Sequence, residues 1–427
     1  MTRKTTISLT LLAMVLTNQP AAAEQTATQT AAKPAPRTIA VFGSSVASGE
    51  RDSRGGYAAR LAEALPRQWK LVNVSRGGDN TVSIQPRFDE LLTAQPDYAI
   101  IGLSLANEGL AAADDDAECQ RVFDQFHRGL CTLINRCRAA NIQPVIGLCY
   151  ANSDFSPEKY EYTRRMNLLI NTWDVPGINF LGAVDDGHGH WVKACEADAG
   201  HPSDRGHEEM FHAIVPSLFD ALAAGKPIPR FTTTDGYWRS DRSSATTPIL
   251  AFQPTHPMRP FTVAVAFRTS AANAPIAQIR AAEKTVRLTV QSGKLVYHGL
   301  NAARLASTAN IADGQWHQLA LAHRYANGQT LLFLDGEPAG AIAESLTPQR
   351  FSLGIANAEP GQGTVDLRDW LIYRSALNPD EAAALHRRQL IHASLELYAP
   401  LHDAPFQQGK TPANLAQSLS EVRVVAE

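Results

Sequence analysis

The sequence predicts a three-layer α/β domain built on a parallel sheet, followed by an all-β sandwich. Three observations support this fold class. From Thr38 to about Leu222, short apolar runs alternate with helical patterns, as in a parallel sheet covered on both faces. Beyond a glycine- and proline-bearing stretch at 225–230, the runs become short, alternating and separated by turn residues. The length of 427 residues also exceeds one ordinary hydrophobic core.

The N-terminus has the features of a secretory signal peptide at residues 1–23. Arg3 and Lys4 precede a short apolar stretch, and three alanines at 21–23 offer a cleavage site. The apolar stretch is too short for a stable membrane span. Residues 24–37 have the composition of a linker, which argues against the alternative of a buried N-terminal helix. We therefore expect a secreted or periplasmic protein with no membrane span.

The nearly even charge balance does not suggest a nucleic-acid or anionic-membrane binding surface. Lys and Arg number 39 and Asp and Glu number 42, so we expect no nucleic-acid partner. Five cysteines lie before residue 228, and an odd number leaves at least one unpaired within the chain. No cysteine spacing suggests a metal site, and we interpret most of them as small buried residues.

Five apolar runs predict the strands of the α/β domain, at 38–43, 70–74, 98–103, 144–148 and 179–184. Between them, Tyr57, Leu61 and Leu65 recur at helical spacing, and Ser156-Pro157 predicts the start of a helix over 157–173. We place this domain at residues 38–228. Strands alternating with helices in this way favour right-handed crossovers between parallel strands.

Residues 229–427 form the predicted sandwich domain. Its expected strands include 261–267, 286–290, 295–297, 317–323, 330–334 and 367–373. Asn327-Gly328 and Asp335-Gly336 are typical of tight hairpin turns. Only 380–389 has a helical pattern in this domain.

Polar residues that can perform ester hydrolysis follow the predicted strands. Ser45 ends the run Thr38-Ile-Ala-Val-Phe-Gly-Ser-Ser45 and is the candidate nucleophile, because an imidazole can take its proton. His201 is the candidate base, and Asp198 can hold its ring in the required tautomer. The backbone N–H groups of Ser45 and Gly78 and the side-chain amide of Asn107 are the candidate oxyanion donors. The alternative roles are a turn serine, a turn glycine and a helix-capping asparagine.

These four blocks, in the order Ser, Gly, Asn and Asp-x-x-His, resemble the SGNH (GDSL-type) hydrolases over about 38–222. The resemblance implies a flavodoxin-like three-layer fold and a serine carboxylic-ester hydrolase that needs no cofactor or metal. Two blocks depart from the family. Gly43-Ser44-Ser45 replaces its usual Gly-Asp-Ser, and Leu105-Ala106-Asn107-Glu108 replaces its usual Gly-x-Asn-Asp. We expect Leu105 to narrow the mouth of the site.

Several residues near these blocks compete for roles. We interpret Asp204 as a helix cap, with Glu208 nearby, and His207 as a residue on the surface of the final helix. The run from Asp185 to His190 contains possible zinc ligands, but its glycines place no pair on one helical face, so we favour a structural or substrate-lining loop. His190 and Trp191 are weak candidates for lining the substrate, and packing is an equal alternative for Trp191.

Three segments of the second domain resemble laminin-G-like, concanavalin-A-like jelly rolls over about 252–401. They begin at Asp313-Gly-Gln-Trp316, Leu332-Phe-Leu-Asp335-Gly336 and Leu367-Arg-Asp-Trp370. The resemblance implies a fold that often binds glycans, in some members with calcium, and in others only packs against a catalytic domain. We expect Trp316 and Trp370 in the core.

The sequence thus predicts a secreted serine esterase that removes acyl groups, foremost acetyl, from carbohydrate. Its partner would be an acylated small molecule or polysaccharide, with a glycan as one option for the C-terminal domain. One alternative keeps the mechanism and changes the substrate to lipid or thioester acyl chains. Another is a glycan-binding or adhesion protein with a degenerate hydrolase domain, against which the complete Ser/His/Asp set argues.

Overall fold

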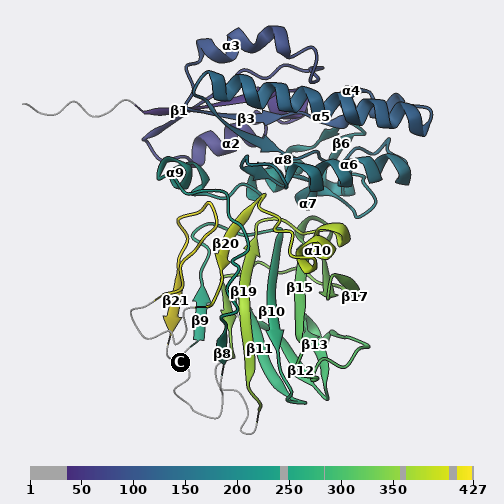
Figure 1. The fold of residues 1–427 in the computed structure, drawn as a ribbon. Helices are drawn as coiled ribbons and strands as arrows, with labels where there is room; N and C mark the ends of the chain where they lie inside the picture. Colours follow the sequence, from purple (N-terminus) through teal and green to yellow (C-terminus); the bar gives the residue numbers. More distant parts are fainter. Residues whose placement is uncertain (1–35, 241–248, 283, 356–361, 403–410, 426–427) are drawn as a thin grey trace, which may run out of the picture. The chain divides into compact units, whose positions relative to one another are not determined.

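The computed structural model describes residues 36–240, 249–282, 284–355, 362–402 and 411–425 (Figure 1). The predicted signal peptide and nearly all of the predicted linker lie outside the described residues. Within the described ranges, every helix is too short or too polar to cross a bilayer.

The α/β domain is built on a five-stranded sheet in the order β2-β1-β3-β4-β5, with every neighbouring pair parallel. The strands are β1 (Arg37–Gly43), β2 (Trp69–Asn73), β3 (Tyr98–Gly102), β4 (Gln143–Gly147) and β5 (Gly177–Ile178). The first four lie within one residue of the predicted runs. The fifth prediction is wrong, because 181–184 forms the buried helix α7 (Leu181–Val184). A short apolar run does not distinguish a buried strand from a buried helical turn.

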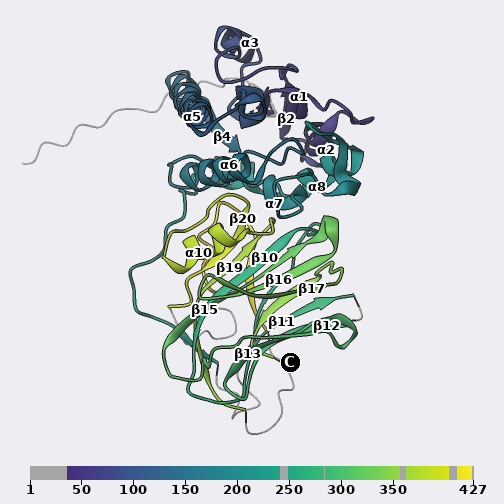
Figure 2. The same cartoon turned by 90° about the vertical axis from the view of Figure 1, so that its right-hand side faces the viewer.

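Helices cover both faces of this sheet (Figure 2). Ile39 and Val41 of β1 pack with α2 (Gly56–Ala64), α7, α8 (Asp204–His212) and α9 (Leu218–Ala223). Ala40 and Phe42 point to the other face, as alternation along a strand requires. That face packs against α3 (Phe88–Thr93), α4 (Leu105–Glu108), α5 (Asp116–Ala139) and α6 (Pro157–Ile170). Ser156 caps α6 as predicted. The remaining short elements are α1 (Ser45–Ser48), β6 (Glu196–Asp198), β7 (His201–Pro202) and the 3-10 helices η1 (Gln85–Arg87), η2 (Leu110–Ala112) and η3 (Lys193–Cys195).

The C-terminal part is an all-β sandwich of two antiparallel sheets. One sheet has the order β17-β16-β15-β10-β19-β20, with β8 also pairing β19, and the other has the order β14-β13-β12-β11-β18-β9-β21. The strands are β8 (Trp238–Ser240), β9 (Ile249–Phe252), β10 (Phe261–Arg268), β11 (Ala274–Ala281), β12 (Lys284–Gln291), β13 (Lys294–His298), β14 (Arg304–Ala306), β15 (Trp316–Arg324), β16 (Gln329–Leu334), β17 (Glu337–Ala343), β18 (Arg350–Leu353), β19 (Val365–Tyr373), β20 (Leu395–Ala399) and β21 (Val422–Val425), with η4 (Leu300–Ala302) and η5 (Tyr325–Asn327) between strands.

Most expectations for this part hold. Asp335 and Gly336 both have positive φ between β16 and β17, as a tight hairpin turn requires. Helix α10 (Pro379–His386) lies within the predicted helical segment except for its first residue. Trp370 is in the core, but Trp316 is only half-buried, with its ring beneath the guanidinium groups of two arginines.

From Pro36 onward the chain forms one compact unit, and polar contacts join its two parts. The Ser394 hydroxyl donates to the Ala213 carbonyl at 2.7 Å. The Asn171 side-chain oxygen accepts from the backbone N–H of His392 at 3.1 Å and of Ala393 at 3.0 Å. The predicted boundary near residue 228 remains a prediction.

All five cysteines are free thiols, in agreement with their interpretation as small buried residues. Four are buried and Cys131 is half-buried. Burial raises the pKa of the Cys137, Cys149 and Cys195 thiols to about 12.

Candidate active site

The nucleophile candidate Ser45 is placed by the close approach of two central strands. A Cβ on Gly43 would lie 2.1 Å from the Gly102 carbonyl oxygen, so only glycine allows β1 to pass β3 at this point. The Ser44 N–H then donates to the same carbonyl at 3.0 Å, and the chain turns into α1. Ser45 is therefore the first helical residue after the carboxyl end of β1, where open parallel sheets place their reactive groups.

Ser45, His201 and Asp198 form a continuous line of hydrogen bonds. His201 Nε2 lies 2.9 Å from Ser45 Oγ, and His201 Nδ1 lies 2.7 Å from Asp198 Oδ1. Asp198 and His201 are partners in the short β6–β7 ladder. Burial opposes ionisation of Asp198, but the hydrogen bond and charge of His201, the Gly200 N–H and the charge of Arg51 together outweigh it, so the pKa of this carboxyl lies below its usual value. The arrangement can move a proton from the serine hydroxyl to the imidazole.

The rival carboxylate Asp204 has another role. Ser203 is the N-cap of α8 and its hydroxyl accepts from Gly206 N–H, so the prediction of Asp204 as the cap is wrong. The Asp204 carboxylate instead accepts from the Ser53 N–H at 3.0 Å and from the Ser53 hydroxyl. It fixes the loop that follows α1.

His207 is buried rather than on the helix surface, which contradicts the prediction for it. Its Nε2 lies 3.1 Å from the Glu50 carbonyl oxygen, and burial lowers its pKa. Because the ring faces a backbone carbonyl rather than Ser45, its geometry suits positioning of the Glu50 backbone.

The candidate oxyanion donors, Ser45, Gly78 and Asn107, remain a prediction, and their surroundings leave them available for that role. Gly78 has φ of +81°, and a Cβ there would meet nothing within 4 Å, so the position is open on its side-chain side. Among the described residues, the Ser45 and Gly78 N–H groups donate no backbone hydrogen bond. The Asn107 Oδ1 accepts from the Ser104 hydroxyl at 3.1 Å, which orients Nδ2 as the donor. Ser104, not Asn107, occupies the N-cap of α4, so the capping alternative for Asn107 is excluded.

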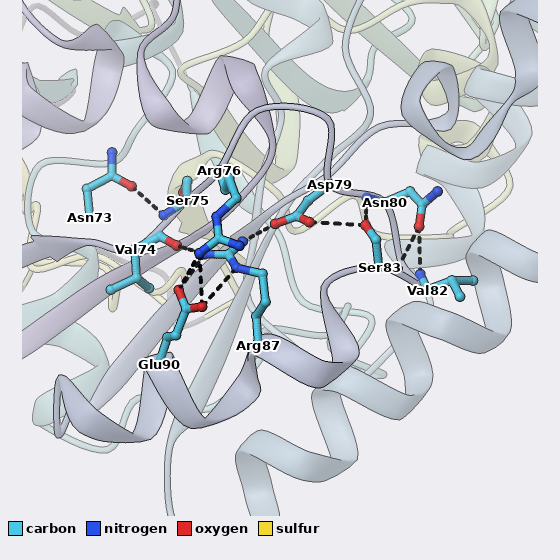
Figure 3. Close-up of polar contacts among 10 residues, drawn as sticks. All are labelled: Asn73, Val74, Ser75, Arg76, Asp79, Asn80, Val82, Ser83, Arg87 and Glu90. Atoms are coloured by element: carbon cyan, nitrogen blue, oxygen red, sulfur yellow. Dashed lines mark hydrogen bonds and ion pairs between the residues drawn. The ribbon is translucent and has the colours of Figure 1, made fainter.

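A buried ion pair holds the loop that carries Gly78 (Figure 3). The Arg87 guanidinium binds the Asp79 carboxylate and donates to the Val74 carbonyl at 2.7 Å. The side chains of Arg87 and Asp79 are 10% and 7% exposed. Glu90 accepts from Arg87 at 2.8 Å and from Arg76 at 3.0 Å (Figure 3). The loop is thus fixed at both ends of its turn.

Glu108 joins the Gly78 loop to the Asn107 helix, a role that the sequence analysis missed. Its buried carboxylate accepts from the Thr81 N–H at 2.8 Å, the Thr81 hydroxyl at 2.7 Å and the Gln125 amide at 2.7 Å. Leu105 is 1% exposed and packs in the core. The expectation that Leu105 narrows the mouth of the site is therefore wrong.

Two further charged residues that the sequence analysis missed, Glu50 and Arg51, lie beside the line of hydrogen bonds. Arg51 Nε lies 3.0 Å from Asp198 Oδ2, and Glu50 Oε2 lies 3.9 Å from His201 Nε2. Arg51 has φ of +65°, in the left-handed region of backbone conformation. The next residue, Asp52, forms a buried ion pair with Arg60 and holds this loop in place. The sequence signal that could have pointed to these residues is the run of three charged residues directly after Gly49.

The loop before the Asp198 block is held by its own hydrogen bonds. Asp185 is buried and accepts from the Tyr160 hydroxyl at 2.6 Å and the Gly189 N–H at 2.9 Å. Across the described part of the chain, no three acidic, histidine or cysteine side chains gather as a metal site would need. The His190 Nε2 lies 3.1 Å from the Phe155 carbonyl oxygen. Trp191 is 3% exposed and donates to the Ala199 carbonyl at 2.9 Å, which favours the packing alternative over stacking on a sugar.

Comparison with known proteins identifies the family of the first domain. Residues 41–209 match the model of the GDSL-like Lipase/Acylhydrolase family. The chain therefore contains a GDSL-like acylhydrolase domain, followed by the all-β sandwich. No curated protein matches the chain.

Three solved structures illustrate the partial matches to this chain. A lipolytic protein of the G-D-S-L family from Desulfitobacterium hafniense aligns at 15% identity and a TM-score of 0.35 over 41% of this chain and 96% of its own. A protein described as carbohydrate-binding, from Bacteroides ovatus, aligns at 13% identity and a TM-score of 0.33, over 41% of this chain and only 55% of its own. The mouse laminin alpha1 chain, domains LG4-5, aligns at 16% identity and a TM-score of 0.28, over 36% of this chain and 47% of its own. Since these similarities are low, the fold assignment depends on the strand order and the family model.

Proposed function

We propose that this chain is a serine carboxylic-ester hydrolase in which Ser45 is the nucleophile, His201 the general base and Asp198 the residue that orients His201. The observation that carries the proposal is the unbroken line from Asp198 through His201 to Ser45, at 2.7 and 2.9 Å. Ser45 would attack the ester carbonyl while His201 takes its proton. The resulting oxyanion would accept from the N–H groups of Ser45 and Gly78 and from Asn107. His201 would then protonate the leaving alcohol, and water would release the acid.

We further propose that the substrate is an ester of a short acyl group, acetyl foremost, on a carbohydrate. Charged side chains beside the triad support this choice, since Glu50, Arg51 and Asp198 are all partly exposed there. Such a surface favours a hydroxyl-rich alcohol over a lipid. An apolar cavity of about 210 Å³ does exist, lined by Leu61, Phe211, Pro257 and neighbours, but none of the proposed catalytic or oxyanion residues lines it.

The N-terminal segment supports export, so we propose that the enzyme acts outside the cytoplasm, in the periplasm or after secretion. The sandwich would then be an accessory domain, with a glycan as its proposed ligand.

Replacement of Ser45 tests the proposal. Ser45→Ala should lower kcat/KM for p-nitrophenyl acetate by at least about 10⁴-fold and abolish labelling by a fluorophosphonate. Ser48→Ala is the matched control, because it also removes a hydroxyl from this short helix. Within the described residues, the Ser48 hydroxyl donates to the Ser45 carbonyl alone. Acetate release from acetylated polysaccharides, compared with p-nitrophenyl esters of increasing chain length, then tests the substrate. Activity of Ser45→Ala within tenfold of wild type contradicts the proposed mechanism.

A further inference from the structure

Glu50 is held rigidly at the edge of the site. Its N–H donates to the Ser45 carbonyl at 3.0 Å, and its own carbonyl oxygen lies 3.1 Å from Nε2 of the buried His207. The backbone of Glu50 is therefore fixed on both sides. Its side chain is 49% exposed, so the carboxylate has no structural need to point inward.

The carboxylate nevertheless lies between the imidazole and the oxyanion loop. Glu50 Oε2 is 3.9 Å from His201 Nε2. On the other side, a Cβ on Gly77 would lie 2.0 Å from Glu50 Oε1, so the absence of a side chain at Gly77 leaves the space that this carboxylate fills. Within the described residues, His201 is the one basic group found within ion-pair distance of Glu50.

The distance to His201 excludes a second triad acid. Asp198 already accepts from Nδ1 at 2.7 Å, whereas 3.9 Å from Nε2 is beyond hydrogen-bond range. Arg51 pairs with Asp198, so it does not neutralise Glu50. The Glu50 carboxylate thus keeps its capacity to accept hydrogen bonds from a substrate.

The reaction places a particular part of the substrate at this point. His201 Nε2 must come within about 3 Å of the leaving alcohol oxygen to protonate it. A carboxylate oxygen about 4 Å from the same nitrogen is then in reach of a group on the next carbon of that alcohol. Because a carboxylate only accepts, the matching group is a hydroxyl.

We propose that Glu50 is a specificity-determining residue that accepts a hydrogen bond from a hydroxyl next to the ester-bearing carbon of a sugar or polyol. The inference rests on the proposed esterase function and names the part of the alcohol that the site recognises. Esters of simple alcohols lack the donor and would bind without this hydrogen bond.

The test compares 2-hydroxyethyl acetate with 2-methoxyethyl acetate, which have similar electron withdrawal but differ in the hydroxyl donor. Wild type should prefer the hydroxy ester in kcat/KM. Glu50→Ala should reduce this preference, the ratio of the two kcat/KM values, by about tenfold or more, as expected for a hydrogen bond to a charged group. Glu50→Gln keeps an acceptor without the charge and should give an intermediate ratio. Glu63→Ala removes an exposed carboxylate of α2 that pairs with Arg54 and should keep the wild-type ratio.

A ratio unchanged within twofold in Glu50→Ala overturns the inference. So does an equal loss on both esters, which would mean that Glu50 only supports the fold of the site. Cleavage of p-nitrophenyl acetate but of neither glycol ester also overturns it while leaving the esterase function intact. If wild type hydrolyses no ester and carries no fluorophosphonate label at Ser45, the proposed function itself fails.

Discussion

The two sides of Ser45 are built differently. On the side of the proton relay, the ion pair that includes the triad acid is open to solvent, with Arg51 62% and Asp198 40% exposed. On the side of the oxyanion donors, the ion pair that holds the Gly78 loop is buried, with Arg87 10% and Asp79 7% exposed. Charge moves through the relay during the proposed reaction, whereas the oxyanion donors only have to stay in place. The difference suggests that solvent-exposed pairs serve where protonation changes and buried pairs serve where position must not change.

The energetics of ion pairs sharpen this contrast. An exposed pair contributes about 0–1 kcal/mol and is screened by salt. Removing one partner of a buried pair costs about 3–5 kcal/mol, because the other charge is left without compensation. Changes on the oxyanion side should therefore affect stability as well as turnover, and changes on the relay side should affect turnover and its pH dependence.

The largest effect is expected within the relay. Asp198→Asn should lower kcat/KM by about 10⁴-fold, the loss known for this change in serine proteases, because an amide does not hold the His201 ring in the required tautomer. The melting temperature should change little, since Asp198 is partly exposed. Steady-state kinetics on p-nitrophenyl acetate measure the loss. Asp204→Asn is the comparison, and a greater loss there would show that the wrong carboxylate has been assigned.

On the oxyanion side, Asn107→Ala should lower kcat by about 10²–10³-fold with a smaller change in KM. The Asn107 amide would strengthen its hydrogen bond only as charge develops on the substrate oxygen. Kinetics and a melting curve on the same variant separate catalysis from folding. Normal turnover in a destabilised protein would exclude the oxyanion role.

Arg87→Met should destabilise the fold by about 3–5 kcal/mol and lower kcat by about tenfold. The substitution leaves Asp79 buried without its cation and frees the loop that carries Gly78. Urea denaturation measures the first effect and kinetics the second. The double variant with Asp79→Asn should recover part of the stability, and no recovery would argue against the buried pair as the cause.

The smallest effect is expected for Arg51→Ala. It should change kcat/KM by less than about fivefold, an effect that about 1 M salt removes. Arg51 is one of the charges that hold the pKa of Asp198 below its usual value, so its loss should raise that pKa and move the acid limb of the kcat/KM profile to higher pH. The depressed pKa of Asp198 means that its contribution to stability is present above the unfolded-state pKa and is lost as pH falls through the folded value. Removing Arg51 makes this contribution of Asp198 to stability smaller. In the kinetics, an acid limb of kcat/KM that moves to lower pH would contradict the proposed effect of Arg51 on Asp198.

The sequence predicted the parts of this site that depend on local pattern. Apolar runs located β1 to β4, and the positions after them gave Ser45, Gly78 and Asn107. The pairing of His201 with Asp198 followed from their spacing of three residues. The seven-stranded sheets were only partly predicted, because strands such as β9 and β21 pair across more than 160 residues.

The residues that the sequence did not predict depend on long-range geometry. Arg51 and Asp198 are 147 residues apart in the sequence and meet only in the folded chain. The burial of Glu108 has no local signal in the sequence, because it depends on three donors from two other segments. His207 lies at a helical position that a sequence pattern assigns to solvent, but the loop after α1 covers it.

The five free thiols bear on the compartment in which this chain is expected to fold. Burial raises the pKa of the Cys137, Cys149 and Cys195 thiols, so little of each is thiolate near neutral pH. Disulfide exchange proceeds through the thiolate, so these three thiols are protected from exchange once the core has closed. These thiols can react with disulfides during folding, before the core closes around them. A slow-folding variant should accumulate mixed disulfides that the wild-type chain avoids.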